Sequence, residues 1–416
     1  MQRIFYIGII LLLFASCRKT EDIDNNILRL YGDALEDIGY GITKADDGFV
    51  ITGQLTEVIR NGNLIDNGNS VKKLGIIRTN STGDVMWQKY IGDQAVTVGS
   101  KAVVLEDGSV VSVGYSVDRL TQLKGVYIAK TDNQGNQKTT KIFNNTGDPE
   151  NKYNQYGIDI LKTTSGFLVL GVTDAEKVGT TDSTGNIAGK KDILVMKLDN
   201  NLDEIESWAA GYTGNDEAVA IKPDNGGGYI VVATTDRSDK APGVQSKNNI
   251  LLVKINALGN FTQQRIIGGT AEENAADIEI LSDGYLVVAT SGTEASGQKG
   301  YAWRLSQNIF AAPVYDHPIE INEGSTPLSF RINAVSRYKT SSFVMAGYTG
   351  TGSSARMLVF LTDDEGNLLK GKSVISGGTG SQSVNDVISD DGGNIYAVGK
   401  NSYENNSMIS LLKFRF

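Results

Sequence analysis

The chain has 416 residues and a formal net charge of −9, and it contains 48 glycines but only 6 prolines. No stripe of lysine and arginine is gathered in this acidic sequence, which argues against nucleic acid as a partner because phosphate backbones are bound by clustered basic side chains. One cysteine excludes an intramolecular disulfide, and with a single histidine as well we expect neither a His/Cys metal site nor a histidine-dependent nucleophile. We therefore expect neither a metal nor another cofactor.

The N-terminus has the form of a bacterial secretion signal. A short basic start is followed by an apolar run over residues 4–14, which is too short to cross a bilayer as a helix. The next residues, Ala15-Ser16-Cys17, resemble a lipobox, whose cysteine is lipidated and becomes the mature N-terminus. We predict a signal peptide at 1–16, lipidation of Cys17 and a flexible tether over 17–26. The alternative is an ordinary secretory signal with a chance cysteine.

This resemblance implies a lipid anchor in the outer membrane. Two or more acyl chains hold a protein stably at a bilayer, whereas a single chain does not. Arg18 directly after the cysteine argues, by analogy with lipoprotein sorting, against retention at the inner membrane. We expect a cell-surface location, and the periplasmic face stays open as an alternative.

A motif repeated seven times organises residues 27–416 into one expected domain. A typical copy reads Asp283-Gly284-Tyr285-Leu286-Val287-Val288-Ala289, a turn followed by an apolar run and a small residue. The closing small residues of the seven copies are Gly53, Gly114, Gly171, Ala233, Ala289, Gly347 and Gly399. Their spacing of about sixty residues is typical of a modular array.

The fourth copy shows what one module contains. Its apolar segments are 217–222, 229–233, 249–255 and 261–267, and glycine-rich or Asn-Gly-type turns separate the first pair and the last pair. Four short antiparallel strands followed by a crossing to the next module form one propeller blade. We therefore predict an all-β fold, a seven-bladed β-propeller with four antiparallel strands per blade.

The last copy lacks a fourth strand, because the chain ends at Phe416 within its third. The segment 27–33 has the pattern of the fourth-strand segment 87–93. We expect this N-terminal strand to complete the last blade and so to close the ring.

Strand order predicts two unlike faces. Turns between strands one and two, and between three and four, are short and share one face, which we name the short-turn face. The other connections, such as 54–71, 144–156, 172–191 and 234–248, are long and share the opposite, long-loop face. Binding residues concentrate on long loops of a rigid scaffold.

Six tyrosines on or beside these loops are the candidate ligand-binding or partner-binding residues: Tyr115, Tyr153, Tyr156, Tyr212, Tyr348 and Tyr403. They could stack on sugars or anchor a peptide or protein, or they could cap blade edges.

Cations recur in one register of the third strand, and acids precede the first hairpin turn. The cations are Arg78, Lys130, Lys197, Lys254, Arg304 and Lys413, and the acids are Asp46, Asp107, Asp224, Asp283 and Asp390. We expect modest ion-pair latches between the two sets near the short-turn face. A ring of cations that receives an anionic ligand is the alternative.

From Tyr31 onward, the modules resemble the glycine-rich propeller repeats of bacterial secreted and surface proteins. They share the Asp-Gly-aromatic-apolar-small strand and the apolar-Lys-Leu-Asp third strand, as in Met196-Lys197-Leu198-Asp199. With the lipobox, the resemblance implies a non-enzymatic binding or scaffolding lipoprotein of an outer-membrane complex, for example a TonB-dependent nutrient importer. The implied partners are an outer-membrane barrel or a companion lipoprotein, and the ligand could be a peptide or a glycan.

Two further interpretations stay open. No catalytic residue is singled out by a motif, but a carbohydrate-active enzyme needs only two carboxylates, and these require no local pattern. The alternative function is therefore such an enzyme, with a carboxylate pair near the propeller channel. The third interpretation is a purely structural subunit of an outer-membrane machine.

Overall fold

The computed structural model describes residues 26–33, 35–61, 64–92, 96–143, 153–175, 191–212, 214–237, 248–269, 271–403 and 406–416. The side chains of residues 59–61, 64–69 and 403 are outside this description. The expected signal peptide, Cys17 and nearly all of the expected tether also lie outside the described residues.

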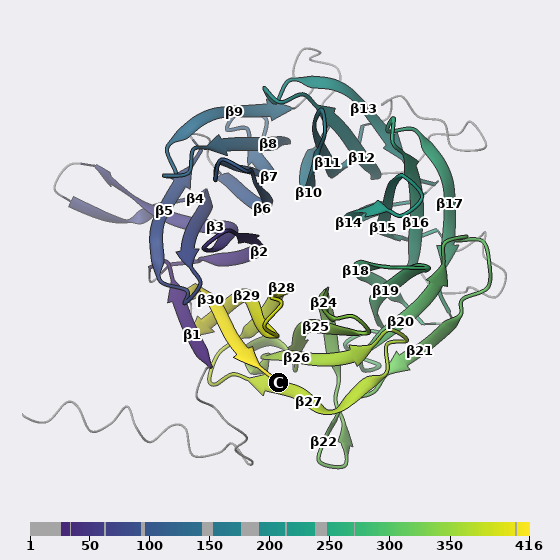
Figure 1. Cartoon of the computed structure of the whole chain (residues 1–416). Helices are drawn as coiled ribbons and strands as arrows, with labels where there is room; N and C mark the ends of the chain where they lie inside the picture. Colours follow the sequence, from purple (N-terminus) through teal and green to yellow (C-terminus); the bar gives the residue numbers. More distant parts are fainter. Residues whose placement is uncertain are drawn as a thin grey trace, which may run out of the picture.

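The described chain is a propeller of β-sheets arranged around a central opening (Figure 1). We name its four-stranded antiparallel groups units 1 to 7, in chain order. Units 1 to 3 are β2 (Ile38–Ala45), β3 (Gly48–Asn61), β4 (Leu64–Asn80), β5 (Val85–Ile91); β6 (Val96–Val104), β7 (Val110–Val117), β8 (Lys124–Thr131), β9 (Gln137–Phe143); and β10 (Gln155–Thr163), β11 (Gly166–Thr173), β12 (Asp192–Leu198), β13 (Glu204–Ala210).

The remaining units follow the same order from the channel to the rim. Units 4 and 5 are β14 (Asp216–Asp224), β15 (Gly228–Thr235), β16 (Asn249–Asn256), β17 (Phe261–Ile267); and β18 (Glu273–Leu281), β19 (Gly284–Ser291), β20 (Lys299–Ser306), β21 (Tyr315–Ile319). Units 6 and 7 are β24 (Phe330–Lys339), β25 (Ser342–Thr349), β26 (Arg356–Asp363), β27 (Leu368–Ser376); and β28 (Gln382–Ser389), β29 (Asn394–Tyr403), β30 (Asn406–Arg415), β1 (Ile27–Tyr31). A small hairpin, β22 (Asn322–Glu323) and β23 (Thr326–Pro327), joins units 5 and 6, and a short 3-10 turn covers Gly352–Ser354.

The prediction of an all-β propeller with four antiparallel strands per blade is confirmed, but the prediction of seven separate blades is wrong. Within the described residues, units 3 to 7 are five separate four-stranded sheets. Units 1 and 2 instead form one eight-stranded sheet, because Lys72 in β4 pairs in parallel with Val96 in β6. The sequence repeat does not reveal this bridge, since β4 begins at Leu64, inside the segment 54–71 that we expected to be a long loop.

Ring closure by the N-terminal strand is confirmed. Strand β1 pairs antiparallel with β30, from Ile27 opposite Lys413 to Tyr31 opposite Ile409. The last sheet therefore takes three strands from the C-terminus and one from the start of the described chain. Opening the ring would expose the edge of β30 and lose these backbone hydrogen bonds.

Every innermost strand carries an irregularity at the same place. The register shifts lie between Gly39 and Gly41, Gly99 and Lys101, Gly157 and Asp159, Ala218 and Ala220, Ala275 and Asp277, Ile332 and Ala334, and Val384 and Asp386. A bulge of this kind leaves one residue unpaired and re-aims its neighbours. It also explains the small residue that closes each motif. A Cβ added to Gly114 would lie 1.9 Å from the Val98 carbonyl oxygen on the innermost strand, and one added to Gly399 would lie 2.0 Å from that of Ser383.

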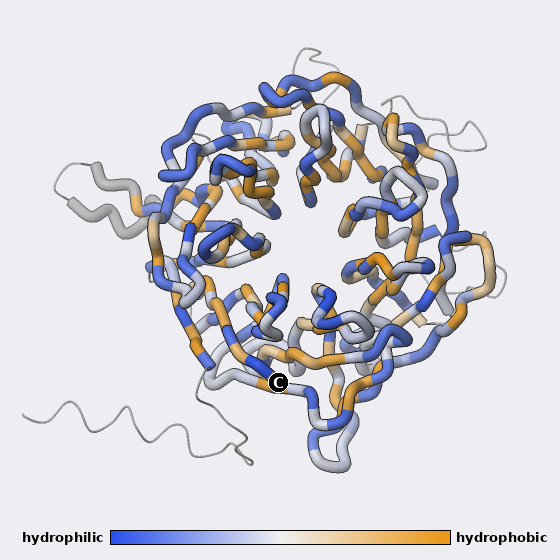
Figure 2. The backbone as a smooth tube through the Cα atoms, viewed as in Figure 1, coloured by the Kyte–Doolittle hydropathy of each residue, from blue (hydrophilic) through white to orange (hydrophobic). Residues whose placement is uncertain are grey.

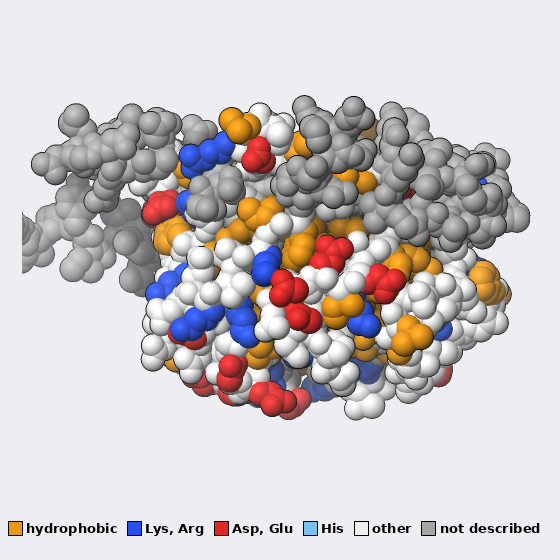
Figure 3. Space-filling view, turned by 90° about the horizontal axis from the view of Figure 1, so that it is seen from above, with side chains coloured by type: hydrophobic (Ala, Val, Ile, Leu, Met, Phe, Trp, Pro, Cys, Tyr) orange, Lys and Arg blue, Asp and Glu red, His pale blue; other side chains and the backbone are white. Residues whose placement is uncertain are grey.

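The hydrophobic core is divided among the junctions between neighbouring units. One cluster joins units 4 and 5 through Ile230, Leu252 and Val287, and another joins units 7 and 1 through Ile51 and Val398. Figure 2 shows hydrophobic segments within the wall of the ring and hydrophilic turns around it. On the side seen in Figure 3, described lysines and arginines lie among aspartates and glutamates, and no single sign of charge covers the described surface.

Candidate functional site

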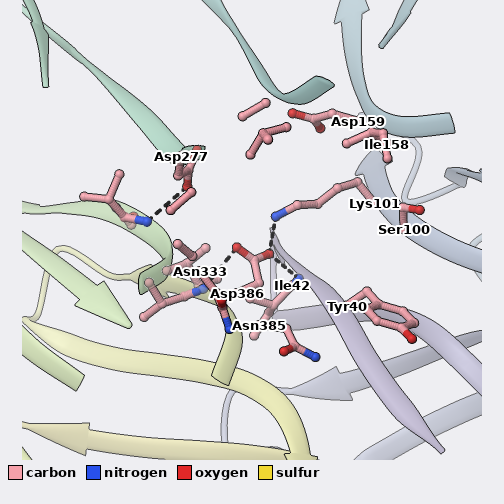
Figure 4. A pocket seen from close by; sticks show the side chains of 18 of the residues that line it. Tyr40, Ile42, Ser100, Lys101, Ile158, Asp159, Asp277, Asn333, Asn385 and Asp386 are labelled. Carbon is pink, nitrogen blue, oxygen red and sulfur yellow. Dashed lines mark hydrogen bonds and ion pairs between the residues drawn. The ribbon is translucent and has the colours of Figure 1, made fainter. Parts of the chain in front are cut away.

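The innermost strands line a cavity of about 360 Å³ in the channel, with both apolar and charged side chains in its wall (Figure 4). This volume lies in the range of small-ligand pockets. Its charged lining side chains are Lys101, Asp159, Lys222, Asp277, Glu279 and Asp386. All six come from innermost strands, and they sit either directly after the register shift or two residues further on.

The position directly after the shift follows a pattern around the ring. From unit 1 to unit 7 it holds Gly41, Lys101, Asp159, Ala220, Asp277, Ala334 and Asp386. Each aspartate is thus followed in the next unit by glycine or alanine. Three pairs of an aspartate and a small residue fill six of the seven positions. The seventh position, in unit 2, holds Lys101.

The three aspartates fasten neighbouring units together. Asp386 accepts a hydrogen bond from Val387 N at 3.0 Å in its own strand and from Ile42 N at 2.8 Å in the next unit. Asp277 does the same with Ile278 N at 2.8 Å and Val335 N at 3.0 Å.

The third aspartate repeats this arrangement with a weaker bridge. Asp159 accepts from Ile160 N at 2.8 Å and from Ile221 N at 3.3 Å, the longest of these six bonds. Asp159 is therefore the least firmly held of the three carboxylates.

Lys101 occupies the odd position and reaches across unit 1. Its ammonium pairs with Asp386, and its stem passes over Gly41, where an added Cβ would lie 3.0 Å from Lys101 Cδ. Figure 4 shows the side chain extending toward Asp386. Burial lowers the pKa of Lys101, but the negative charges of Asp386, Asp159 and Asp277 outweigh burial and raise it overall, so the lysine is a cation.

Hydrogen bonds join six of the seven neighbouring pairs of innermost strands, from a side chain of one strand to the backbone of the next. The aspartates accept from backbone N–H groups, as described above. The other bonds are donated by side chains to carbonyl oxygens: Thr43 to Ala102 O, Ser100 to Gly157 O, Asn333 to Val384 O and Asn385 to Gly39 O. Among the described residues, the junction of units 4 and 5 has no such bond between its innermost strands. There the channel wall holds a side-chain pair instead, Lys222 in β14 and Glu279 in β18, with Nζ and Oε1 3.7 Å apart.

The Glu279–Lys222 pair has the electrostatics of a proton-transfer site. Burial raises the pKa of Glu279, and the opposing charge of Lys222 does not cancel this effect. Burial lowers the pKa of Lys222, but the charges of Asp277, Glu279 and Asp159 raise it overall. Burial also raises the pKa of Asp159, against the effects of Lys101 and Lys222. A buried carboxyl whose acid form is favoured, beside a fixed cation, can act as a general acid.

The predicted tyrosines fall into separate groups on the long-loop side. Tyr115 and Tyr156 lie on either side of Lys124, whose Nζ is 4.4 Å and 5.2 Å from their ring centroids. The Arg237 guanidinium lies 4.3 Å from the Tyr212 ring, and Arg331 donates a hydrogen bond to the Tyr348 hydroxyl at 3.3 Å. The structure therefore joins Tyr115 with Tyr156 but does not gather all six residues at one place.

The other two predicted tyrosines lie apart from these pairs. Tyr153 is half-buried just before β10. Tyr403 ends β29, and its side chain is outside the described set. Whether any of the six tyrosines binds a ligand stays a prediction.

Among the described residues, only two of the expected ion-pair latches are present, Lys254 with Asp224 at 3.0 Å and Arg304 with Asp283 at 3.0 Å, each within one unit. Lys130, Lys197 and Lys413 form no ion pair with a described carboxylate, and Arg78 pairs with Asp47 rather than with one of the expected acids. The single histidine takes part in another contact, since His317 Nε2 lies 3.0 Å from the Glu365 carbonyl oxygen of the next unit. His317 therefore lies at the rim, away from the channel.

No group of three or more histidine, cysteine, aspartate or glutamate side chains within the described ranges could hold a metal ion. No helix in the part of the chain that the structure describes is long and apolar enough to cross a membrane.

Comparison with known proteins places the fold but no family. No family model matches the sequence, and no curated protein is similar to it. Among solved structures, the chain is similar to a polysaccharide lyase described as an ulvan lyase, with 12% identity, 79% of each chain covered and a TM-score of 0.52. The same enzyme bound to -[GlcA(1-4)Rha3S]- gives a TM-score of 0.51. The β-propeller domain of the Trilobed protease from Pyrococcus furiosus gives a TM-score of 0.47 with 7% identity, over 91% of this chain and 94% of that one.

Proposed function

We propose that this protein is a carbohydrate-active enzyme whose reaction takes place in the channel, at the junction of units 4 and 5. The observation that carries the proposal is the Glu279–Lys222 pair. It stands on the channel wall where, at the other six junctions, a side chain of one innermost strand is hydrogen-bonded to the backbone of the next innermost strand. At this junction the side-chain-to-backbone bonds come from outside that pair of strands, from Ala275 N to Thr234 Oγ1 on β15 and from Asn225 Nδ2, after β14, to Leu281 O. A position released from holding the ring together is available for chemistry. The likeness to a polysaccharide lyase shows a fold that can carry such chemistry.

The assigned reaction is hydrolysis of a glycosidic bond by two carboxyl groups. Glu279 donates its proton to the leaving oxygen, because burial favours its acid form. Asp159 accepts a proton from the attacking water, because burial raises its pKa but the charges of Lys101 and Lys222 oppose this effect and favour its carboxylate form. Its bond to Ile221 N is also the longest of the bridging set. Lys222, which interacts with both carboxyls, stabilises Glu279 as a carboxylate after the transfer.

The test is turnover of a polysaccharide panel by the purified chain, followed by the appearance of reducing ends. We expect Glu279→Gln and Asp159→Asn each to lower the rate by about 10²–10⁴-fold, the usual contribution of a positioned acid or base. Glu206→Gln, on the exposed outer strand β13, removes the same kind of charge and should leave the rate unchanged. A wild-type chain that cleaves no polysaccharide, or a Glu279→Gln chain with full activity, contradicts the assignment.

A membrane-anchored binding subunit is the second candidate, favoured by a separate observation. Exposed apolar side chains lie on β1 (Leu28 49%, Leu30 45%) and at the start of β5 (Val85 48%, Met86 53%). These strands are neighbours, since Arg29 pairs with Asp84 at 2.9 Å. β1 follows directly after the expected tether of Cys17. We propose lipidation of Cys17 and an outer-membrane location, with an outer-membrane barrel or a companion lipoprotein as partner. Purification of the native protein in detergent tests this proposal, because a stoichiometric companion is expected and its absence would oppose it.

A further inference from the structure

A cluster of aromatic residues and one lysine lies beside the channel cavity, across units 1 to 3. It consists of Tyr40 in β2, Tyr115 in β7, Lys124 at the start of β8 and Tyr156 in β10. All four side chains are partly exposed. Tyr40 lines the cavity itself. Burial raises the pKa of Tyr40 to about 12, and the neighbouring Tyr115 and Glu36 add to this effect. The cluster therefore runs outward from the cavity wall.

The two rings hold the Lys124 ammonium in place. The backbone N–H of Lys124 is fixed by Asn154 Oδ1 at 3.1 Å, and its Nζ lies near both the Tyr115 and Tyr156 rings, at 4.4 Å and 5.2 Å from the centroids. Contact with ring faces does not use the N–H donors of an ammonium, which has three of them. The cluster thus presents a positioned cation with donors available to a ligand.

Neighbouring carboxylates are already engaged with other groups. Glu36 is ion-paired with Lys72 at 2.7 Å, and Glu217 pairs with Lys191. Asp174 accepts a hydrogen bond from Asn154 Nδ2 at 2.8 Å. Among the described residues, no carboxylate forms an ion pair with Lys124. An anionic group of a ligand would therefore find this cation without a described carboxylate paired to it.

We propose that Lys124, flanked by Tyr115 and Tyr156, binds the anionic substituent of an acidic polysaccharide that extends from the channel. The substituent is a carboxylate or a sulfate ester, since either accepts hydrogen bonds from an ammonium. The phenol rings offer apolar faces to the sugar beside it. This inference rests on the proposed carbohydrate activity and names its substrate class.

The test is binding, measured separately from cleavage. Polygalacturonate serves as the uronate probe, dextran sulfate as the sulfate probe and dextran as the neutral probe, each titrated against the full chain by calorimetry. We expect one acidic probe to bind and dextran not to bind, and which acidic probe binds identifies the substituent. Lys124→Gln should weaken that binding about tenfold, the order expected for losing one charged hydrogen bond. Lys124→Arg should retain it.

A matched control is present elsewhere in the chain. Lys339 lies 5.1 Å from the Tyr338 ring at the other end of an innermost strand, so Lys339→Gln removes a similar contact and should not change binding. Equal binding of dextran and the acidic probes, or full binding by Lys124→Gln, would overturn the inference. Loss of cleavage in Glu279→Gln with binding retained separates the two proposals. Binding that depends on Lys124 without cleavage by the wild type would leave only the inference standing.

Discussion

The junction of units 7 and 1 and the junction of units 4 and 5 are fastened at different places. In the first, Asp386 in the channel wall accepts from Ile42 N across the junction and pairs with Lys101. In the second, the equivalent residue of unit 4 is Ala220, and the fastening carboxylate is Asp224 at the end of β14. Asp224 accepts from the Tyr285 hydroxyl of unit 5 at 2.7 Å and also from Gln307.

This difference shows that the contacts that stabilise the ring and the residues of the candidate site lie at different places. Apolar clusters fill both junctions, but apolar contact has little directional preference, whereas a buried carboxylate with fixed donors sets the position of its neighbour. In unit 4 the fastening carboxylate, Asp224, lies at the short-turn end of β14 and not in the channel wall. Lys222 and Glu279 occupy the channel wall at this junction. The junction that is not fastened at the channel is the one that carries the candidate chemistry.

The largest effect is expected from breaking the first junction at the channel. Asp386 has a side chain only 6% exposed, and Asp386→Ala removes the acceptor of two backbone N–H groups and the partner of Lys101. We expect a loss of about 3 kcal/mol in the free energy of unfolding, measured by urea denaturation. Asp84→Ala, which removes an exposed partner of Arg29, is the control and should have little effect. Equal midpoints for the two variants would show that the channel aspartates do not fasten the ring.

A smaller effect is expected from filling the space beneath Lys101. In Gly41→Ala the new Cβ would lie 2.6 Å from the Ser100 carbonyl oxygen and 3.0 Å from Lys101 Cδ, so backbone and lysine must both shift. We expect a loss of about 2 kcal/mol in the free energy of unfolding, within the usual range for overpacking. Gly378→Ala, where a Cβ meets nothing within 4 Å, is the control. A Gly41→Ala protein as stable as the control would mean that the Lys101 side chain does not need the space over Gly41 to reach Asp386.

The sequence predicts the strands and the closure of the ring better than it predicts the site. Turn glycines and apolar runs are local signals, so the four-stranded module and the pairing of segment 27–33 with the C-terminus follow from the repeat. The channel aspartates are visible only when modules are aligned on the residue before the bulge. Asp159, Asp277 and Asp386 then appear in every second unit, each followed by isoleucine or valine.

Other features leave no sequence signal of their own. The parallel bridge between Lys72 and Val96 depends on how far β4 extends, and the contact of Lys124 with two tyrosines depends on how neighbouring units pack. The position of the tyrosines near long loops could be predicted from the sequence. Their separation into groups that contact different cations could not be predicted. Long-range packing, which no local pattern encodes, decides these contacts.

The smallest predicted effect is a pH dependence of stability that differs between the two sides of unit 4. On the unit 3 side, Asp192 and Asp216 flank Gly211, and an added Cβ there would lie 2.5 Å from Asp192 Oδ1 and 2.3 Å from Asp216 Oδ2. On the unit 5 side, the equivalent residues around Gly268 are Asn249 and Glu273. Burial raises the pKa of Asp192 to about 6. Burial, with Asp192 contributing, raises that of Asp216 to about 7.

The sign of the pH effect follows from proton counting. Between about pH 4 and pH 7 the folded protein holds protons on these carboxyls that the unfolded chain has released, so stability falls as pH rises through this window. Asp192→Asn removes one of these groups and supplies an amide like that of Asn249, so the melting temperature should fall less steeply between pH 4 and pH 7. The change in stability at the upper end should be on the order of 1 kcal/mol. Asn249→Asp should introduce a similar slope at the unit 5 side. If neither substitution altered the slope, the two carboxyls would not retain protons in this pH window, and the difference between the two sides of unit 4 would be one of packing alone.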